Sequence, residues 1–387
     1  MPHLNKLKWY RVGSLLVCTC LLSSCGGSDG SSAGEAPAAR VNMGIRAYAY
    51  LATPGTLTTY SVDPSTGALM DLGGSPLTFP VSWPFEGIRQ IATDSSGQTL
   101  YLLHYSGVHA YTIDRNAGAL TEVAGSPFAS GVGPSSFALD ESGAHLFVAS
   151  DTSPAAPINT LISAFSVNGP GVLVPLANYT VSGELSTLAT AGSHLYVAGF
   201  YTNSISVFSI EPSGELIQNV PGSPFATDTG PHGIAVDPSG AVLYTANDGM
   251  PTANEPAPGS ISAFTIDSST GALTPVTGNP LPIAAAGQIS IDPMGRFLFV
   301  PETNGVSVYA INTTTGVLTE VAGSPFLAGT APVSVSVDPT DQIAYVVNQG
   351  SANISEFTLG STGTLTPLAG SPVPVGTNPV YMTIVSQ

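Results

Sequence analysis

Short apolar runs of about four to six residues alternate with polar turns from residue 45 to the C-terminus. One repeat begins with an apolar stretch at 233–237 and continues through the turn Asp237-Pro238-Ser239-Gly240 to a second run at 243–246. A third run at 260–266 alternates polar and apolar residues, and a short fourth run follows at 272–276. Period-two alternation between turns built on Pro and Gly predicts four β-strands per repeat and no helix.

A Gly-Ser-Pro element marks the repeats along the whole chain. It begins at Gly74, Gly125, Gly222, Gly323 and Gly370, and a Gly278-Asn279-Pro280 variant lies between Gly222 and Gly323. If one degenerate copy lies between 127 and 222, the spacing is about 49 residues, within the range of propeller blades. We expect the Phe that follows the element, as at Phe128, Phe225 and Phe326, to fill the gap between blades.

Two series of strands can be counted, and each has seven members. Inner strands are predicted at 88–93, 135–139, 186–190, 233–237, 288–292, 333–338 and 380–385, and second strands at 47–52, 100–104, 146–150, 195–198, 243–246, 298–301 and 344–347. The two series are out of phase, because the first repeat lacks an inner strand and the last has one to spare. Ring closure resolves this and leaves no long sheet edge exposed. The predicted fold is therefore all-β: a seven-bladed β-propeller over 45–387 with four-stranded antiparallel blades, closed by the C-terminal strand joining the N-terminal blade.

The N-terminal segment differs from the rest of the chain and is typical of a targeting signal. Lys6, Lys8 and Arg11 precede an apolar stretch at 12–22, and Leu22-Ser23-Ser24-Cys25 resembles a bacterial lipobox. We therefore expect 1–24 to be a lipoprotein signal peptide, Cys25 to be lipidated, and 25–44 to be a flexible Gly/Ser/Ala tether. The alternatives are an ordinary secretory signal or a retained anchor. The prediction places a monomer at the cell envelope, on an outer membrane facing the periplasm or exterior.

Charge excludes one class of partner. The 387 residues carry a formal net charge of −17, and all lysines lie in the first eleven residues. Beyond the predicted signal only five arginines remain against 25 acidic residues, so the surface would repel phosphate backbones. We expect no nucleic-acid partner, and solubility is the simplest role for the acidity.

The repeated pattern resembles a known family. Its consensus, Pro-x4-Val-Asp-Pro-x-Gly, then Leu-Tyr-x2-Asn, then Ile-Ser-x-Phe-x-Ile-x4-Gly-x-Leu-Thr, is similar to that of the lactonase-type seven-bladed propellers. These are also called the 6-phosphogluconolactonase-like or cycloisomerase 2 family, and they are related to YVTN-repeat proteins. The resemblance spans roughly 45–387 and implies hydrolysis of a lactone ring or the reverse cyclisation. It also implies catalytic His, Arg and Glu side chains at the mouth of the central channel.

Non-repeating polar residues at the strand ends that share one face are the candidate site. Arg89 and His232 stand at inner-strand starts three blades apart, so they should face each other across the mouth. Arg89 would stabilise an oxyanion and His232 would act as general base on water. At the second-strand ends, Glu302 or His104 would orient that base or serve as an acid. Ser135, Asn247 and Asn348 are the further candidate ligand-binding residues.

Each candidate has a simpler alternative. Arg89 could pair only with Glu86, His232 could be a variable turn position, and Glu302 could be a solvated loop residue. No Cys or His pair has zinc-ligand spacing, an Asn-Asp-Gly turn explains 247–249 better than calcium does, and no phosphate loop is present. We therefore predict no metal and no cofactor.

The leading functional hypothesis is a lactonase-like hydrolase that acts on a small sugar or organic-acid lactone at the channel mouth. The alternative is a non-enzymatic binding or scaffolding propeller of the cell envelope that uses its top loops, including 150–159 and 247–259. In that case the partner is an unknown envelope component, and the regularity of the repeats favours this option.

Overall fold

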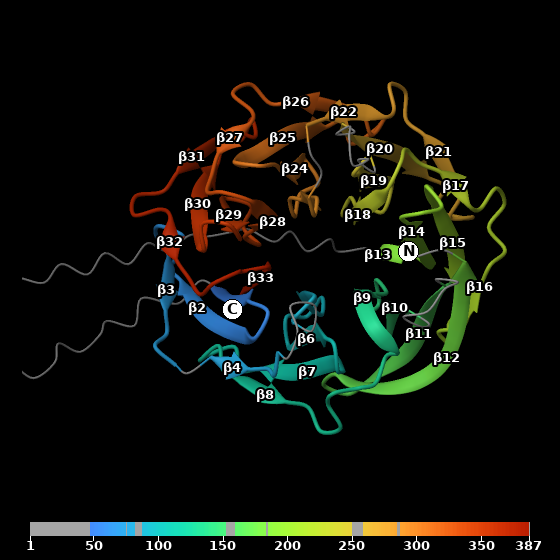
Figure 1. The fold of residues 1–387 in the computed structure, drawn as a ribbon, viewed down its shortest axis with the longest axis horizontal. Coiled ribbons are helices and arrows are strands. Elements are labelled where there is room, and N and C mark those ends of the chain that lie inside the picture. The colour runs from blue at the N-terminus through green and yellow to red at the C-terminus, as the bar shows by residue number, and fades with distance from the viewer. Residues whose placement is uncertain are drawn as a thin grey trace, which may run out of the picture. The chain divides into compact units, whose positions relative to one another are not determined.

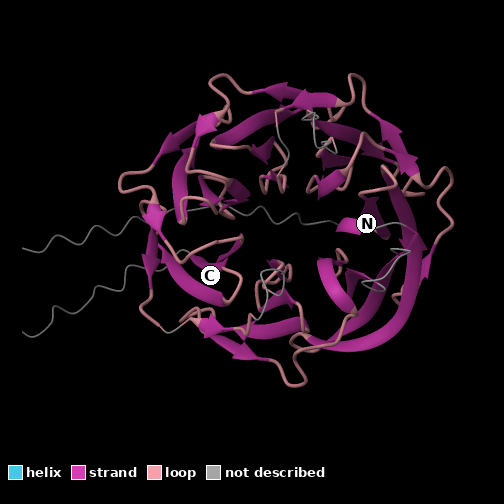
Figure 2. Ribbon diagram, viewed as in Figure 1, coloured by secondary structure: helices cyan, strands magenta, loops and turns pink. Residues whose placement is uncertain are grey.

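The computed structural model describes residues 47–386 except 75, 82–86, 152–158, 183–184, 250–257 and 285–286. The chain divides into two units, 1–42 and 43–387, and every described residue belongs to the second. The predicted signal peptide, Cys25 and the whole predicted tether lie outside the described residues. All regular structure in the described residues is β-strand (Figure 2). Among these residues we find no apolar helix long enough to cross a membrane.

Seven antiparallel sheets stand around a common centre as the blades of a propeller (Figure 1). The inner strands are β33 (Tyr381–Ser386), β5 (Gln90–Thr93), β9 (Val132–Leu139), β13 (Leu185–Ala191), β18 (Pro231–Val236), β23 (Ser290–Ile291) and β28 (Pro332–Val337). The second strands are β1 (Ala47–Ala52), β6 (Thr99–His104), β10 (His145–Asp151), β14 (His194–Gly199), β19 (Val242–Asn247), β24 (Phe297–Pro301) and β29 (Ile343–Asn348).

Outside these lie two further strands per blade. The third strands are β2 (Thr56–Val62), β7 (Gly107–Ile113), β11 (Asn159–Asn168), β15 (Ser204–Ile210), β20 (Gly259–Ile266), β25 (Gly305–Ile311) and β30 (Asn353–Leu359). The fourth strands are β3 (Leu69–Asp71), β8 (Leu120–Glu122), β12 (Val172–Ser182), β16 (Leu216–Ile217), β21 (Leu273–Pro275), β26 (Leu318–Glu320) and β31 (Leu365–Pro367). The seven-bladed prediction is confirmed.

The predicted ring closure is confirmed as well. The C-terminal strand β33 pairs antiparallel with β1, in a register that runs from Ala47 opposite Ser386 to Ala52 opposite Tyr381. The first blade thus contains strands from both ends of the chain segment that forms the propeller. Its strand order is β3-β2-β1-β33. Because the second strand of each blade is covered on both faces by neighbouring blades, its residues are almost entirely apolar.

The Gly-Ser-Pro elements have a role beyond the predicted filling of the blade gap. They lead into the short strands β4 (Leu77–Thr78), β17 (Phe225–Ala226), β22 (Leu281–Ile283), β27 (Phe326–Leu327) and β32 (Val373–Pro374), which pair with the third strand of their own blade. The Ser223 hydroxyl accepts a hydrogen bond from the Val207 N–H at 2.9 Å, and the Asn279 amide oxygen accepts one from the Ala263 N–H at 2.7 Å. The Asn variant therefore preserves the same acceptor.

The three Phe side chains pack against apolar clusters shared by two adjacent blades, as expected. The degenerate copy between 127 and 222 is the blade β9–β12. There the eleven-residue strand β12 takes the place of a short fourth strand and a Gly-Ser-Pro element.

Buried tyrosines join one blade to the next. The hydroxyls of Tyr50, Tyr196, Tyr244 and Tyr345 donate to the carbonyl oxygens of Gly118, Gly271, Gly316 and Gly67 in the neighbouring blade. The Tyr345 bond crosses the junction between the last blade and the first. Gly67 has φ of 78°, and a Cβ there would lie 2.5 Å from Ile343 Cγ1, so this turn requires glycine.

A buried ion cluster lies at the opposite end of the inner strands from their starts. Arg296 Nε donates to Asp292 Oδ2 at 3.1 Å, and Arg296 Nη2 contacts Asp341 Oδ2. The Asp292 and Asp341 side chains are 0% and 4% exposed. Burial, together with the neighbouring Asp292, raises the pKa of Asp341 to about 7, and Arg296 opposes this rise. One guanidinium therefore holds two carboxyl groups together.

Replacing Arg296 with Met is expected to make the stability of the protein depend more steeply on pH. The folded-state pKa of Asp341 is raised, so its favourable contribution is present below pH 4 and is lost as the pH rises through about 7. Without the Arg296 guanidinium, the ionised carboxylates of Asp292 and Asp341 repel each other above about pH 7. We expect a loss of about 2 kcal/mol at pH 8 and a smaller loss at pH 5, measured by urea unfolding.

The control is Asp341→Asn in the Arg296→Met background. Asp341 has φ of 60°, a conformation that Asn adopts readily, so this change removes the charge without backbone strain. It should restore most of the stability lost at pH 8. An equal loss for Arg296→Met at both pH values would contradict the charge explanation.

Candidate functional site

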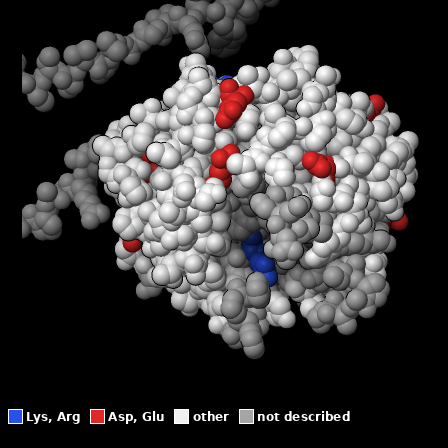
Figure 3. All heavy atoms as spheres, turned by 45° about the horizontal axis from the view of Figure 1, so that its top comes forward, with Lys and Arg blue, Asp and Glu red and all other residues white. Residues whose placement is uncertain are grey.

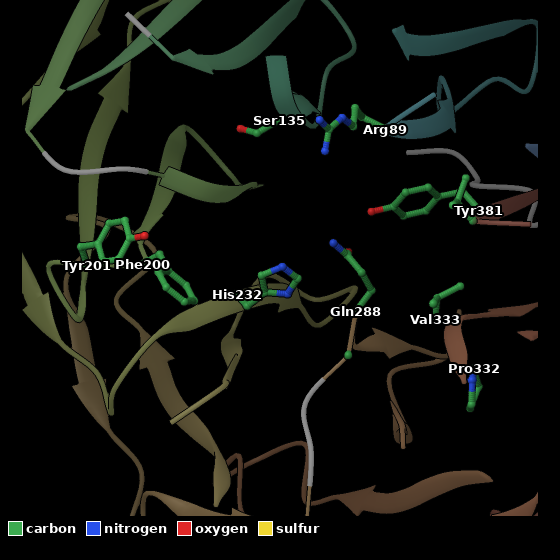
Figure 4. Close-up of a pocket in the computed structure, with 11 residues that line it drawn as sticks. Arg89, Ser135, Phe200, Tyr201, His232, Gln288, Pro332, Val333 and Tyr381 are labelled. Carbon is green, nitrogen blue, oxygen red and sulfur yellow. The ribbon is translucent and has the colours of Figure 1, made fainter. Parts of the chain in front are cut away.

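The centre of the ring holds a pocket of about 500 Å³ at the end where the inner strands begin. Figure 4 shows side chains from several blades pointing into this space. We call it the mouth pocket, and it is lined by Arg89, Ser135, Phe200, Tyr201, His232, Gly287, Gln288, Pro332, Val333, Val380 and Tyr381. The structure thus brings three of the predicted site residues, Arg89, Ser135 and His232, to one cavity.

Irregularities in the inner strands direct His232, Ser135 and Val333 into this pocket. His232 lies between the pairs Pro231–Asn247 and Gly233–Ala246, where the register of β18 against β19 shifts by one residue. The same shift places Ser135 in β9 and Val333 in β28 outside the regular pairing. Such a bulge leaves its extra residue unpaired and redirects the side chain. His232 is exposed as a result.

The opposite wall carries a cation and a phenol. Arg89 precedes β5, is half-buried, and its backbone N–H donates to the Leu103 carbonyl at 2.8 Å. Burial raises the pKa of Tyr381 to about 12, although the nearby Arg89 opposes this. Tyr381 is therefore a hydroxyl donor at neutral pH. Figure 4 shows the Arg89 guanidinium, the Tyr381 hydroxyl and the Gln288 amide directed toward the same space as the His232 ring.

An acidic partner for His232 comes from the turn that follows β19. The Asp248 N–H donates to the Gly230 carbonyl at 2.9 Å, which anchors this turn beside β18. Burial raises the pKa of Asp248, and the neighbouring His232 opposes the rise. Asp248 is therefore a candidate electrostatic partner of the His232 imidazole. The sequence showed Asp248 only as part of an Asn-Asp-Gly turn, so this role was missed.

Two aromatic side chains complete the pocket, and the sequence analysis missed both. Phe200 and Tyr201 follow β14 and pack edge to face, with ring centroids 5.1 Å apart and an interplanar angle of 87°. Tyr201 is 54% exposed, although a large apolar ring is normally buried. An exposed aromatic pair beside polar groups offers a surface on which a ligand ring can pack. Their position in a loop after a second strand was the available signal.

The other predicted site residues do not line the mouth pocket. Asn247 is buried, and its amide group donates to the Ser260 and Ser262 hydroxyls at 3.0 and 2.9 Å. Asn348 is buried as well, and its amide group donates to Asn353 Oδ1 and Ser355 Oγ at 2.8 and 2.9 Å. Both side chains thus fix the end of a second strand within its own blade.

Glu302 and His104 also contact residues of their own blades. The Ser307 hydroxyl donates to Glu302 Oε1 at 2.6 Å. His104 is 4% exposed, and its Nδ1 lies 2.9 Å from the Ser106 hydroxyl. Their predicted catalytic roles, and the ligand-binding roles of Asn247 and Asn348, stay predictions without a contact to this pocket.

Few charged side chains surround the mouth pocket. In Figure 3 a basic group lies inside a central hollow, while acidic groups are few and well separated on the surrounding surface. Arg89 is the one permanently charged side chain among the described lining residues. The described residues contain no cluster of three or more His, Cys, Asp or Glu that could hold a metal ion.

Comparison with known proteins agrees with this architecture. The family model for the lactonase seven-bladed β-propeller matches residues 99–233, 191–326 and 283–383. No curated protein gives a significant match.

Solved structures give the same fold at low identity. A proposed 6-phosphogluconolactonase from Bacteroides fragilis has a TM-score of 0.70 and 17% identity, covering 90% of this chain and 100% of its own. A periplasmic gluconolactonase from Pseudomonas aeruginosa has a TM-score of 0.69 and 17% identity, covering 88% of this chain and 99% of its own. Because the family model spans most of the propeller, the chain belongs to the lactonase family of seven-bladed β-propellers.

Proposed function

We propose that this protein hydrolyses a small lactone bound in the mouth pocket. The observation that carries the proposal is the placement of Arg89 and His232 on one cavity of about 500 Å³, with Asp248 beside His232. Membership of the lactonase family and the likeness to a periplasmic gluconolactonase support it. Lactone hydrolysis needs a base for water and a donor for the developing oxyanion, and this pocket offers both.

In the proposed reaction, neutral His232 takes a proton from a water molecule as that water attacks the lactone carbonyl carbon. Arg89 stabilises the resulting oxyanion, with Tyr381 and Gln288 as further hydrogen-bond donors. The ring C–O bond then breaks, and the leaving oxygen takes the proton from His232. The product is the open-chain hydroxy acid. Asp248 stabilises the cationic imidazole that forms between these steps.

The pocket chemistry favours a substrate without a phosphate group. Phe200 and Tyr201 would pack on one face of a ring, while Gln288 and Tyr381 would hydrogen-bond to its hydroxyl groups. Arg89 is needed for the reacting carbonyl, so the described lining residues leave no second permanent cation for a phosphate. We therefore propose a sugar or organic-acid lactone of the cell envelope, and a lipid-anchored location there fits such a substrate.

A panel of unphosphorylated γ- and δ-lactones tests the proposal. Acid release by the wild-type protein, recorded at constant pH, should exceed both spontaneous hydrolysis and hydrolysis by the double variant Arg89→Ala/His232→Ala. The control is Met294→Ala, since Met294 is 65% exposed in a turn at the far end of an inner strand. If a folded wild-type protein hydrolyses no lactone faster than the double variant, the proposal fails and the binding alternative gains support.

A further inference from the structure

A hydrogen-bonded chain of Ser106, His109 and Glu122 lies on the blade β5–β8, outside the mouth pocket. Ser106 occupies the two-residue turn between β6 and β7, His109 lies on β7, and Glu122 ends β8. Ser106 Oγ is 3.0 Å from His109 Nε2, and His109 Nδ1 is 3.0 Å from Glu122 Oε1. This order of hydroxyl, imidazole and carboxylate is the arrangement by which many hydrolases activate a serine.

The carboxylate fixes the direction of the hydrogen bonds. Glu122 can only accept when ionised, so His109 carries its proton on Nδ1 and donates it to Glu122. His109 Nε2 is then an acceptor for the Ser106 hydroxyl proton, and His104 Nδ1, 2.9 Å from the same hydroxyl, is a second one. The Ser126 hydroxyl also donates to Glu122 Oε1 at 2.9 Å and holds that carboxylate in place. The order of these contacts is the one that a nucleophilic serine requires.

Within this chain, His109 is buried and Ser106 is exposed. The His109 side chain is 11% exposed, and the Phe79 ring packs edge to face against it at 5.2 Å. His104 lies on the other side of Ser106 and also contacts Phe79. Ser106 itself is exposed in the turn between β6 and β7.

We propose that Ser106 is the nucleophile of a second hydrolytic site, which acts on small carboxylic esters. Ser106 Oγ attacks the ester carbonyl carbon and its proton passes to His109 Nε2. The alcohol leaves with that proton, and an acyl group remains on Ser106. Water, deprotonated by His109, then releases the acid and restores the serine. Each cycle consumes one ester and one water and yields one acid and one alcohol.

A similar set of residue types in the next blade serves as a comparison. Ser142, Asp140 and His145 lie around the turn between β9 and β10, and Ser142 is exposed. There the Ser142 hydroxyl donates to Asp140 Oδ2 at 2.9 Å, and His145 Nδ1 binds the same carboxylate oxygen at 2.8 Å. The carboxylate stands between the serine and the imidazole, so this hydroxyl has no base and should be inert.

Reaction of the full-length protein with a fluorophosphonate probe tests the proposal. Attack by Ser106 Oγ on phosphorus displaces fluoride, so the expected result is one adduct per chain that maps to Ser106 by peptide mass. Ser106→Ala should abolish this adduct. Glu122→Gln should lower the labelling rate by about tenfold or more, because the neutral amide neither stabilises a protonated His109 nor fixes the proton on His109 Nδ1. Ser142→Ala is the matched control and should label at the wild-type rate.

Turnover of p-nitrophenyl acetate gives a second readout, in which nitrophenol release should fall in parallel with labelling. Glu122 is 47% exposed, so Glu122→Gln carries the test if a change at the buried His109 disturbs folding. The proposal is overturned if the folded wild-type protein forms no adduct, if the adduct maps to another residue, or if Glu122→Gln labels as fast as the wild type. None of these outcomes depends on lactone hydrolysis.

Discussion

Replacing His232 with Gln is expected to lower kcat for lactone hydrolysis by about 10²- to 10⁴-fold, with little change in KM. The physical reason is that Gln cannot accept a proton from water, although it has similar size and can still hydrogen-bond. His232 is exposed on a strand bulge and has no part in the core, so the fold should be unaffected. Steady-state kinetics on the best lactone of the panel measure this change.

Two further variants sharpen the result. Asp248→Asn removes the charge beside His232, and we expect a loss of about tenfold in kcat because the cationic imidazole is then less stabilised. The control Met294→Ala changes an exposed turn residue outside the pocket lining and should leave kcat within about threefold. A His232→Gln variant with wild-type kcat would rule out this residue as the base.

Deleting residues 380–387 is expected to abolish the folded propeller. The deletion removes β33 and its six residue pairs with β1, together with the buried side chains of Met382 and Val385. It also removes the Val380 and Met382 carbonyl acceptors for Ser334 and Ser336 of the neighbouring blade. Losses of about 1.5–3 kcal/mol per buried side chain and about 1 kcal/mol per hydrogen bond together are comparable to the whole stability of a typical domain.

The truncated chain would also leave β1 as an open edge, which favours aggregation. Size-exclusion chromatography and thermal unfolding followed by circular dichroism measure both effects. The control is Tyr345→Phe, which removes one hydrogen bond between the last blade and the first and should cost only about 1 kcal/mol. A monomeric truncated protein with the wild-type melting temperature would show that the ring does not need this closure.

The sequence alone was sufficient for the architecture. The second strands follow from hydrophobic alternation and turn residues, which are local features of the sequence. The number of blades and the closure of the ring follow from counting the repeats. The predicted second strands agree with β1, β6, β10, β14, β19, β24 and β29 to within one residue at each end. The meeting of Arg89 and His232 was also predictable, because equivalent positions in a closed ring must face one centre.

Only the tertiary structure decided what each side chain contacts. Asn247 and Asn348 stand at predicted mouth positions, yet their amide NH2 groups donate hydrogen bonds within their own blades. Asp248 and Tyr201 became site residues because loops of different blades converge on the channel. Ser106, His109 and Glu122 lie on consecutive strands of one blade, and only the structure shows that their side chains contact one another. A repeat fixes the backbone of every blade, whereas side-chain direction depends on bulges and on packing against neighbours that are distant in the sequence.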